Sequence, residues 1–286
     1  MSIKQGDEYR KCLYKYRPLI GNSSDDINLN TLKLLENGEL YFSKPSDFND
    51  PFDAKIDYDS SADENQLRNY FTKIKQQFAG TINSNFDIDV LIEKINNGEI
   101  DKAMYAPSNS EYANSTRIFC LAKDEKNILM WSHYAKDHTG ICIGIKVNYF
   151  QNTLSLKIKN GYVRPIAGIN NFIPAIYINY CNDKPKPYNL FTGSQKDIEE
   201  YLYTKSKDWE YEQEMRMIIH ESLIINNPIC IEKTEIYEII FGLKTPNILK
   251  EKVIDIIKRY PKNGNWINIY KCNEVKGKYA IEKVKL

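Results

Sequence analysis

Residues 209–220, with the sequence WEYEQEMRMIIH, combine closely spaced acidic side chains with an apolar pattern. Successive side chains of an extended chain point to opposite faces. One face of a strand here would therefore carry Glu210, Glu212, Glu214 and Arg216. The methionines and isoleucines of the same segment would form a core face. Neighbouring carboxylates repel, so at least one is expected to have a raised pKa or a cationic partner.

Glu212 and Glu214 are the acidic pair whose chemistry is most useful in such an arrangement. A carboxylate pair can bind a ligand with hydroxyl groups or stabilise an oxocarbenium-like centre, as in glycoside cleavage. The alternative is a solvated strand face on which Arg216 forms a surface ion pair.

A second candidate segment is 129–138, LMWSHYAKDH. His133 could donate a hydrogen bond to a phosphate or carbonyl, and Trp131 and Tyr134 could stack on a planar base. His133 and His138 lack the spacing that places two histidines on one helical face, so no zinc pair is expected. The alternative for His133 beside a tryptophan is a structural role.

The third candidate is YKYR at 14–17. Alternation places Tyr14 with Tyr16, and Lys15 with Arg17. An arginine at the end of a strand could bind a phosphate or carboxylate, because its guanidinium can donate two parallel hydrogen bonds to such a group. A surface arginine on an edge strand is the alternative. The chain has neither G-x-G-x-x-G nor a P-loop, which disfavours a nucleoside triphosphatase.

Hydrophobic periodicity predicts the elements that must position these groups. Strands are expected at 12–17, 40–43, 118–122, 141–147, 162–167, 175–180, 215–220, 236–242, 266–272 and 279–284. Helices are expected at 29–35, 64–78, 88–95, 127–135, 195–207 and 247–259. Short strands outnumber helices, which favours an α+β fold over regular βαβ alternation. We expect one domain over 1–286, with a peripheral helical insert at 60–112.

Composition limits the class of protein. The 286 residues include 39 Lys+Arg and 38 Asp+Glu, giving a net charge of +1 that disfavours a nucleic-acid coat. No run of about 18 apolar residues and no apolar stretch near residue 1 occurs, so neither a membrane partner nor secretion is expected. Six scattered cysteines without C-x-x-C indicate free thiols in the cytoplasm.

Charge is unevenly placed along the chain. Segment 46–64 has seven acids against one lysine, whereas 244–286 has eleven Lys/Arg against four acids. The two segments could form solvated faces that attract each other. Alternatively, the C-terminal segment could be a basic surface that steers an anionic partner.

Six sequence blocks, taken in order, resemble a bacterial family known as domain of unknown function twenty-nine seventy-one. Its members occur near abortive-infection and defence loci. The blocks are LYKYRP at 13–18, LYFSKPSDFNDPFD at 40–53, FCLA at 119–122, MWSHYA with HxGICIGI over 130–145, WxYExExR at 209–216, and IIFG at 239–242.

The layout is also similar, more distantly, to ADP-ribosyltransferases: an aromatic-basic first strand, a helix ending in Asn-Gly, an L-x-F-S strand, and a late E-x-E. That resemblance implies split antiparallel sheets and NAD as the substrate. By this resemblance, Arg17 or Tyr16 on the first strand would grip NAD, a small hydroxyl would support it, and Glu214 would drive transfer. The middle strand reads FCLA, so Ser43 or Ser132 would have to supply the hydroxyl.

The resemblance and the three segments give a set of expected site residues, with no metal. The expected catalytic residues are Glu214, Glu212 and His133. The expected NAD-binding residues are Arg17, Tyr16, Ser43, Asn49, Trp131 and Tyr134.

The leading interpretation is a phage-defence or toxin-like effector that transfers ADP-ribose from NAD to a cellular protein or nucleic acid. With water as acceptor, the same residues would make an NAD glycohydrolase. Its partner would be an antitoxin or another defence protein. Two alternatives stay open: a non-catalytic sensor or antitoxin-like binding protein, and a nuclease in which His133 and the carboxylates act on a phosphodiester.

Overall fold

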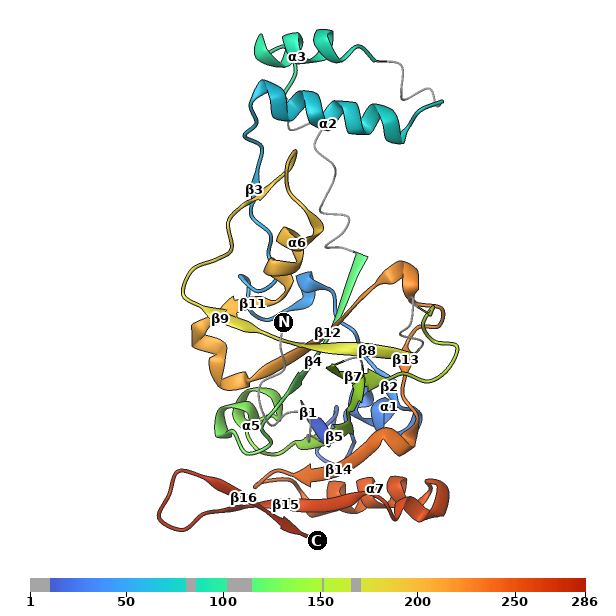
Figure 1. Cartoon of the computed structure of the whole chain (residues 1–286). Coiled ribbons are helices and arrows are strands. Elements are labelled where there is room, and N and C mark those ends of the chain that lie inside the picture. Colours follow the sequence, from blue (N-terminus) through green and yellow to red (C-terminus); the bar gives the residue numbers. More distant parts are fainter. Residues whose placement is uncertain (1–10, 81–85, 102–114, 151, 166–170) are drawn as a thin grey trace.

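The computed structural model describes residues 11–80, 86–101, 115–150, 152–165 and 171–286. Within these residues ten strands form one sheet in the order β16-β15-β14-β5-β1-β4-β12-β8-β7-β6 (Figure 1). The strands are β1 (Cys12–Arg17), β4 (Thr116–Ala122), β5 (Ile141–Lys146), β6 (Asn148–Phe150), β7 (Thr153–Lys157), β8 (Phe172–Tyr177), β12 (Glu214–His220), β14 (Ile236–Phe241), β15 (Asn268–Glu274) and β16 (Ile281–Lys285).

The sheet is mostly antiparallel, which confirms the α+β class. Its parallel pair is β14–β15, whose strands are connected through helix α7 (Asn247–Lys258), as a parallel pair requires a crossover. The split into two sheets that the ADP-ribosyltransferase resemblance implies stays a prediction. Within the described residues the strands join one sheet, in which β1 pairs with β5 over six residues and with β4 at Tyr14 and Ala122.

Helices and shorter strands surround this sheet. The other α-helices are α1 (Leu29–Asn37), α2 (Glu64–Gln77), α3 (Ile88–Asn96), α5 (Ile128–Tyr134) and α6 (Gln195–Leu202). Short 3-10 helices span Pro45–Asp47, Lys207–Glu212, Glu221–Leu223, Lys233–Glu235 and Pro261–Gly264. Three two-stranded pairs join β2 (Glu39–Leu40) with β13 (Ile229–Cys230), β3 (Tyr58–Asp59) with β10 (Tyr188–Asn189), and β9 (Asn179–Cys181) with β11 (Thr204–Ser206).

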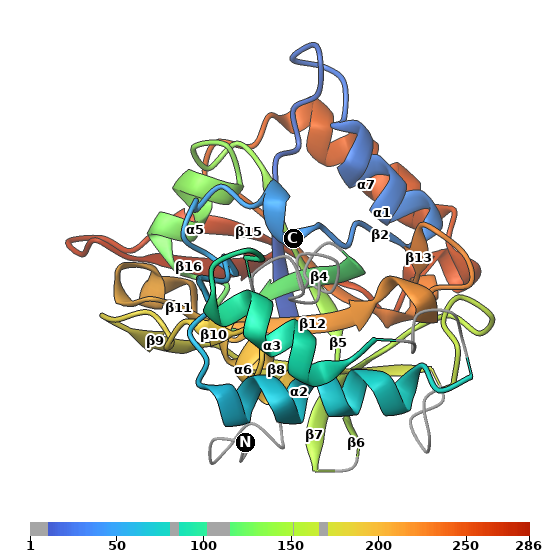
Figure 2. The same ribbon diagram turned by 90° about the horizontal axis from the view of Figure 1, so that it is seen from above.

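The two faces of the sheet bury different side chains. Leu13 and Ile143 belong to the main core, which also takes apolar residues of α1 and α7. Those two helices lie side by side in the view from above (Figure 2). Tyr14 and Tyr16 alternate with Leu13 along β1 and pack instead with Trp131 of α5. Tyr14 and Tyr16 therefore lie on the α5 side of the sheet, whereas Arg17 alternates onto the opposite face with Leu13.

Most sequence-based element predictions are confirmed, and the differences have local causes. The strand expected at 12–17 has those bounds. The helix expected at 195–207 ends at Leu202, because residues 204–206 pair with β9 as strand β11. The strand expected at 162–167 is wrong for its described residues, where Val163 forms only an isolated bridge. Residues 166 and 167 lie outside the described part.

Helices α2 and α3 lie within the segment expected to be a helical insert, away from the ten-stranded sheet (Figure 1). They pack against each other in a separate apolar cluster that includes Leu67, Phe71 and Ile92, with Phe191 joining from outside the segment. Residues 102–112 of the expected insert lie outside the described part. Its status as an insert of a single domain stays a prediction.

Two further sequence expectations concern surface and redox chemistry. No helix in the described part of the chain is long and apolar enough to cross a membrane. All six cysteines are free, as expected, and four of them are buried.

The end of α1 gives a first testable prediction. Gly38 has φ +74°, and a Cβ there would collide with the backbone oxygen of Ile231. Gly277 has the same φ of +74° with nothing within 4 Å of such a Cβ. Gly277→Ala should lower the free energy of unfolding by about 1 kcal/mol, the cost of the left-handed conformation alone. Gly38→Ala should cost about 3 kcal/mol because overpacking adds to that cost. Urea unfolding of both variants checks this, and equal losses would contradict it.

Candidate functional site

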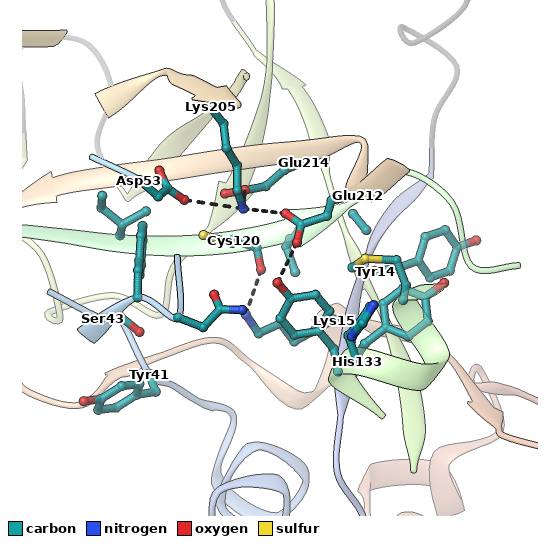
Figure 3. Close-up of a pocket in the computed structure, with 18 of the residues that line it drawn as sticks. Tyr14, Lys15, Tyr41, Ser43, Asp53, Cys120, His133, Lys205, Glu212 and Glu214 are labelled. Carbon is teal, nitrogen blue, oxygen red and sulfur yellow. Dashed lines mark hydrogen bonds and ion pairs between the residues drawn. The ribbon is translucent and has the colours of Figure 1, made fainter. Parts of the chain in front are cut away.

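A cavity of about 400 Å³ lies on the α5 side of β1 and β4. We call it the first cavity. Its walls come from β1, the segment 41–53, β4, α5, β11 and the start of β12, which are far apart in sequence. Two buried carboxylates, Glu212 and Glu214, line one side together with Asp53 and Lys205 (Figure 3).

Glu214 is held by two cations. Its Oε1 accepts a hydrogen bond of 2.6 Å from Nε of Arg216, and its Oε2 lies 3.3 Å from Nζ of Lys205. Nη2 of Arg216 also reaches Oε2 at 3.2 Å. Burial alone would raise the pKa of Glu214, but Arg216 and Lys205 hold that pKa well below its usual range. Glu214 is therefore ionised at neutral pH.

Glu212 has a different environment, although it is buried as well. Its Oε1 accepts a 2.5 Å hydrogen bond from the hydroxyl of Tyr134, and its Oε2 accepts one of 2.6 Å from Lys205. Burial raises the pKa of Glu212, partly opposed by Lys205, and the charge of Glu214 raises it further. The two glutamates thus have pKa values shifted in opposite directions, which is typical of paired acids with different roles.

Lys205 and Asp53 are the members of this cluster that the sequence reasoning missed. Nζ of Lys205 lies 3.4 Å from Oδ2 of Asp53, and Nη2 of Arg216 lies 2.5 Å from the same oxygen. Lys205 thus contacts three carboxylates, and their charges raise its pKa although burial would lower it. A signal was present for Asp53, since it ends the block at 40–53. No such signal marked Lys205, because the apolar spacing around it predicted a helix.

The local backbone explains how Glu212 and Glu214 come to face the same cavity. Residues Lys207–Glu212 form a 3-10 helix, and Gln213 has φ +44° before β12 begins at Glu214. The prediction that one strand face carries all four charged residues is therefore wrong for Glu210 and Glu212. Glu210 is exposed outside the cluster. Glu214 and Arg216 do alternate on one strand face as expected, and Met215 and Met217 lie in the main core.

A family match adds to this geometry. Residues 130–217 match the model of a family described as "Protein of unknown function (DUF2971)". Over these residues the match supports the family resemblance that the sequence blocks indicate. The matched segment contains both glutamates, Lys205 and the α5 residues of the first cavity. No curated protein and no solved structure matches the chain.

The structure of this chain gathers most of the expected site residues. Seven of them line the first cavity: Tyr16, Ser43, Asn49, His133, Tyr134, Glu212 and Glu214. His133 is exposed and lies on α5, across the cavity from Ser43 (Figure 3). Ser132 is absent from the lining and donates to the backbone oxygen of Ile128 at 3.0 Å. Ser43 is thus the better placed of the two candidate hydroxyls.

Trp131 cannot stack on a ligand, which corrects one expectation. Its side chain is fully buried, its indole nitrogen donates to the backbone oxygen of Glu125 at 2.9 Å, and its ring packs edge-on to Tyr16. The helical turn of α5 points Tyr134 toward the cavity and Trp131 into the core. Tyr134 is itself committed to Glu212 through its hydroxyl group.

Arg17 is the other expected residue outside the first cavity. It lines a second cavity, which shares Lys15 and Tyr41 with the first. Lys15 donates a 2.8 Å hydrogen bond to the backbone oxygen of Cys120, and burial lowers its pKa. Alternation along β1 does place Lys15 and Arg17 together, as expected from sequence.

Lys205 is predicted to matter for stability. Replacing Lys205 with Met would leave three neighbouring carboxylates with Arg216 as their remaining cation. We expect the free energy of unfolding to fall by about 3 kcal/mol, since removal of one partner leaves buried charge uncompensated. The matched control is Lys207→Met, at an exposed position two residues later. Chemical denaturation of both variants measures this, and a loss below about 1 kcal/mol at Lys205 would contradict it.

Proposed function

We propose that this protein binds NAD in the first cavity and breaks the bond between nicotinamide and ribose. The ADP-ribosyl group then passes to a cellular protein or nucleic acid, or to water. The observation that carries this proposal is the position of Glu212: a buried carboxylate that faces a cavity and keeps free acceptor capacity. Cavities of a few hundred Å³ are typical of small-molecule sites.

Free acceptor capacity distinguishes the two glutamates. A carboxylate offers about four lone-pair directions. Glu214 accepts contacts from Arg216 at both oxygens and from Lys205. Glu212 accepts one hydrogen bond at each oxygen, from Tyr134 and from Lys205. Glu212 can therefore accept a further hydrogen bond from a ribose hydroxyl, and we assign it the role that the resemblance gave to Glu214.

The chemistry follows from that assignment. When the nitrogen–ribose bond breaks, its electron pair leaves with nicotinamide, whose ring loses its positive charge. The ribosyl carbon becomes oxocarbenium-like, and the carboxylate of Glu212 stabilises this charge. Water or an acceptor group then attacks the carbon and releases a proton. Tyr134 and Lys205 would keep Glu212 ionised and oriented, because hydrogen bonds to the charged form favour it.

The other lining residues would bind the rest of the substrate. Ser43 and Asn49 supply a hydroxyl and an amide along segment 41–53, and Tyr16 and His133 lie on the β1 and α5 walls. Aromatic and amide groups of this kind fix the orientation of a nucleoside in a mainly apolar pocket.

A cellular effect would follow from such an activity. We propose a role as a phage-defence or toxin-like effector, held inactive by an antitoxin or another defence protein, because NAD cleavage or macromolecule modification would stop growth. The growth rate of cells that overproduce the wild-type chain tests this. We expect cells that overproduce the wild-type chain to grow more slowly than cells that overproduce Glu212→Gln. Equal growth rates would contradict this role.

One observation favours a second candidate function. Every carboxylate of the cluster has at least one cationic partner in the resting structure. Such a satisfied network suits a sensor that binds a nucleotide without reacting with it. The two functions differ in whether nicotinamide is released.

The test is to titrate NAD into the purified chain by calorimetry and to measure free nicotinamide by chromatography. Saturable binding with nicotinamide release is the expected result. ATP serves as the control nucleotide, since it shares the adenosine phosphate but has no nicotinamide. Binding without release supports the sensor, and no binding at millimolar NAD contradicts both.

A further inference from the structure

The second cavity has a volume of about 200 Å³ and lies beside the first, since Lys15 and Tyr41 line both. It is formed by β1, by α1 and the β2 strand that follows it, and by the turn before β13. Two amide side chains line it, those of Asn30 and Asn227.

Arg17 is the unusual residue of this cavity. Its Nε is buried without a hydrogen-bond partner among the described residues. Burial lowers the pKa of Arg17, and no carboxylate in the described part of the chain acts against it. Arg17 as a whole is half-buried, but a buried guanidinium nitrogen without a partner costs free energy.

The other charges of the cavity add to this excess. Lys15 and Lys33 also line it, and its acidic residue is Glu39. Oε1 of Glu39 accepts a 2.8 Å hydrogen bond from Asn37. Arg17 and Lys15 repel each other, which contributes to the lowered pKa of Lys15. Among the described residues that line the cavity, three cationic side chains face one carboxylate. The resulting excess of positive charge matches the negative charge of a phosphate dianion.

We propose that the second cavity is a binding site for a phosphate group. A guanidinium presents parallel N–H donors that match phosphate oxygens, and lysines and amides supply additional donors. Bound phosphate would give Nε of Arg17 the partner that the described residues do not provide. The site is argued from its own residues and holds whether or not the first cavity cleaves NAD.

The phosphate can come from two sources. It can belong to a molecule that extends past Lys15 and Tyr41 into the first cavity, as a dinucleotide would. It can also belong to a separate phosphorylated ligand that occupies the second cavity alone. Both sources require the same donors.

The test uses inorganic pyrophosphate as the probe, titrated calorimetrically into the wild-type full-length chain and its variants at low salt. Saturable binding is expected, weakened at least about 10-fold by Arg17→Gln and by Lys33→Gln, because each removes charge-assisted hydrogen bonds. Lys33 is exposed, so its variant keeps the fold even where Arg17→Gln does not. The matched control is Arg164→Gln, at an exposed arginine outside the cavity. No saturable binding, or equal weakening by Arg164→Gln, would overturn the proposal.

Competition then identifies the source. If NAD displaces pyrophosphate and Arg17→Gln weakens both, one molecule spans the two cavities. If pyrophosphate and NAD bind together, the phosphate belongs to a separate ligand. If pyrophosphate binds through Arg17 and NAD does not bind, the phosphate site stands and the proposed NAD chemistry fails.

Discussion

Glu212→Gln is expected to lower the rate of nicotinamide release about 1,000-fold, because the amide cannot stabilise a developing positive charge as a carboxylate does. The substitution keeps the shape of the side chain. The amide oxygen can accept from Lys205, and the amide nitrogen can donate to the Tyr134 hydroxyl, which donates to Glu212 in the wild type. Burial already raises the pKa of Glu212, so a neutral group at this position should cost little stability. Nicotinamide release by the purified variant measures the effect.

The matched control for this prediction is Glu210→Gln, at an exposed residue of the same 3-10 helix. It should keep the wild-type rate. Thermal unfolding of both variants separates a chemical effect from loss of the fold. Wild-type nicotinamide release by a folded Glu212→Gln variant would remove Glu212 from the proposed role.

Arg216→Met is expected to cause the largest loss of stability, about 5 kcal/mol. Arg216 is fully buried, and its guanidinium donates to Glu214 at 2.6 Å, to Asp53 at 2.5 Å and to the backbone oxygen of Leu202 at 2.8 Å. Methionine fills similar space but leaves two buried carboxylates with Lys205 as their remaining cation. Denaturant unfolding measures the loss.

The control for Arg216 is Arg259→Met. Arg259 forms an ion pair of 3.0 Å with Glu36, but its side chain is 66% exposed. Such a surface pair should contribute less than about 1 kcal/mol. Similar losses in the two variants would show that burial of the Arg216 network does not determine its contribution.

Lowering the pH should reduce the difference in the free energy of unfolding between the wild type and Arg216→Met. In the wild type the pKa of Glu214 is lowered by Arg216 and Lys205, so its ionised form stabilises the fold above its ordinary pKa of 4.5. That contribution is lost as the pH falls toward the lowered pKa. In the variant the pKa of Glu214 lies closer to its ordinary value or above it. The difference in the free energy of unfolding between the two proteins should therefore decrease between about pH 6 and pH 3. A difference that stays constant over this range would contradict the stabilising role of ionised Glu214.

The sequence by itself determined the features that depend on local periodicity. Alternation along 12–17 and 215–220 gives strands whose successive side chains lie on opposite faces, because the period of two is a property of the extended backbone. The pairing of Glu214 with Arg216 follows from the same alternation. The apolar spacing at 247–259 likewise indicated α7, which spans Asn247–Lys258.

Only the tertiary structure decided which charged side chains form ion pairs and which aromatic side chains face the first cavity. Asp53 and Arg216 are 163 positions apart, and their contact arises because the segment before β3 lies beside β12. Lys205 reaches Glu212 because residues 204–206 pair with β9 instead of continuing α6. Trp131 is buried and Tyr134 faces the cavity, since the position of α5 against β1 decides which of its sides is covered. Such contacts depend on packing between distant segments, and no local periodicity encodes them.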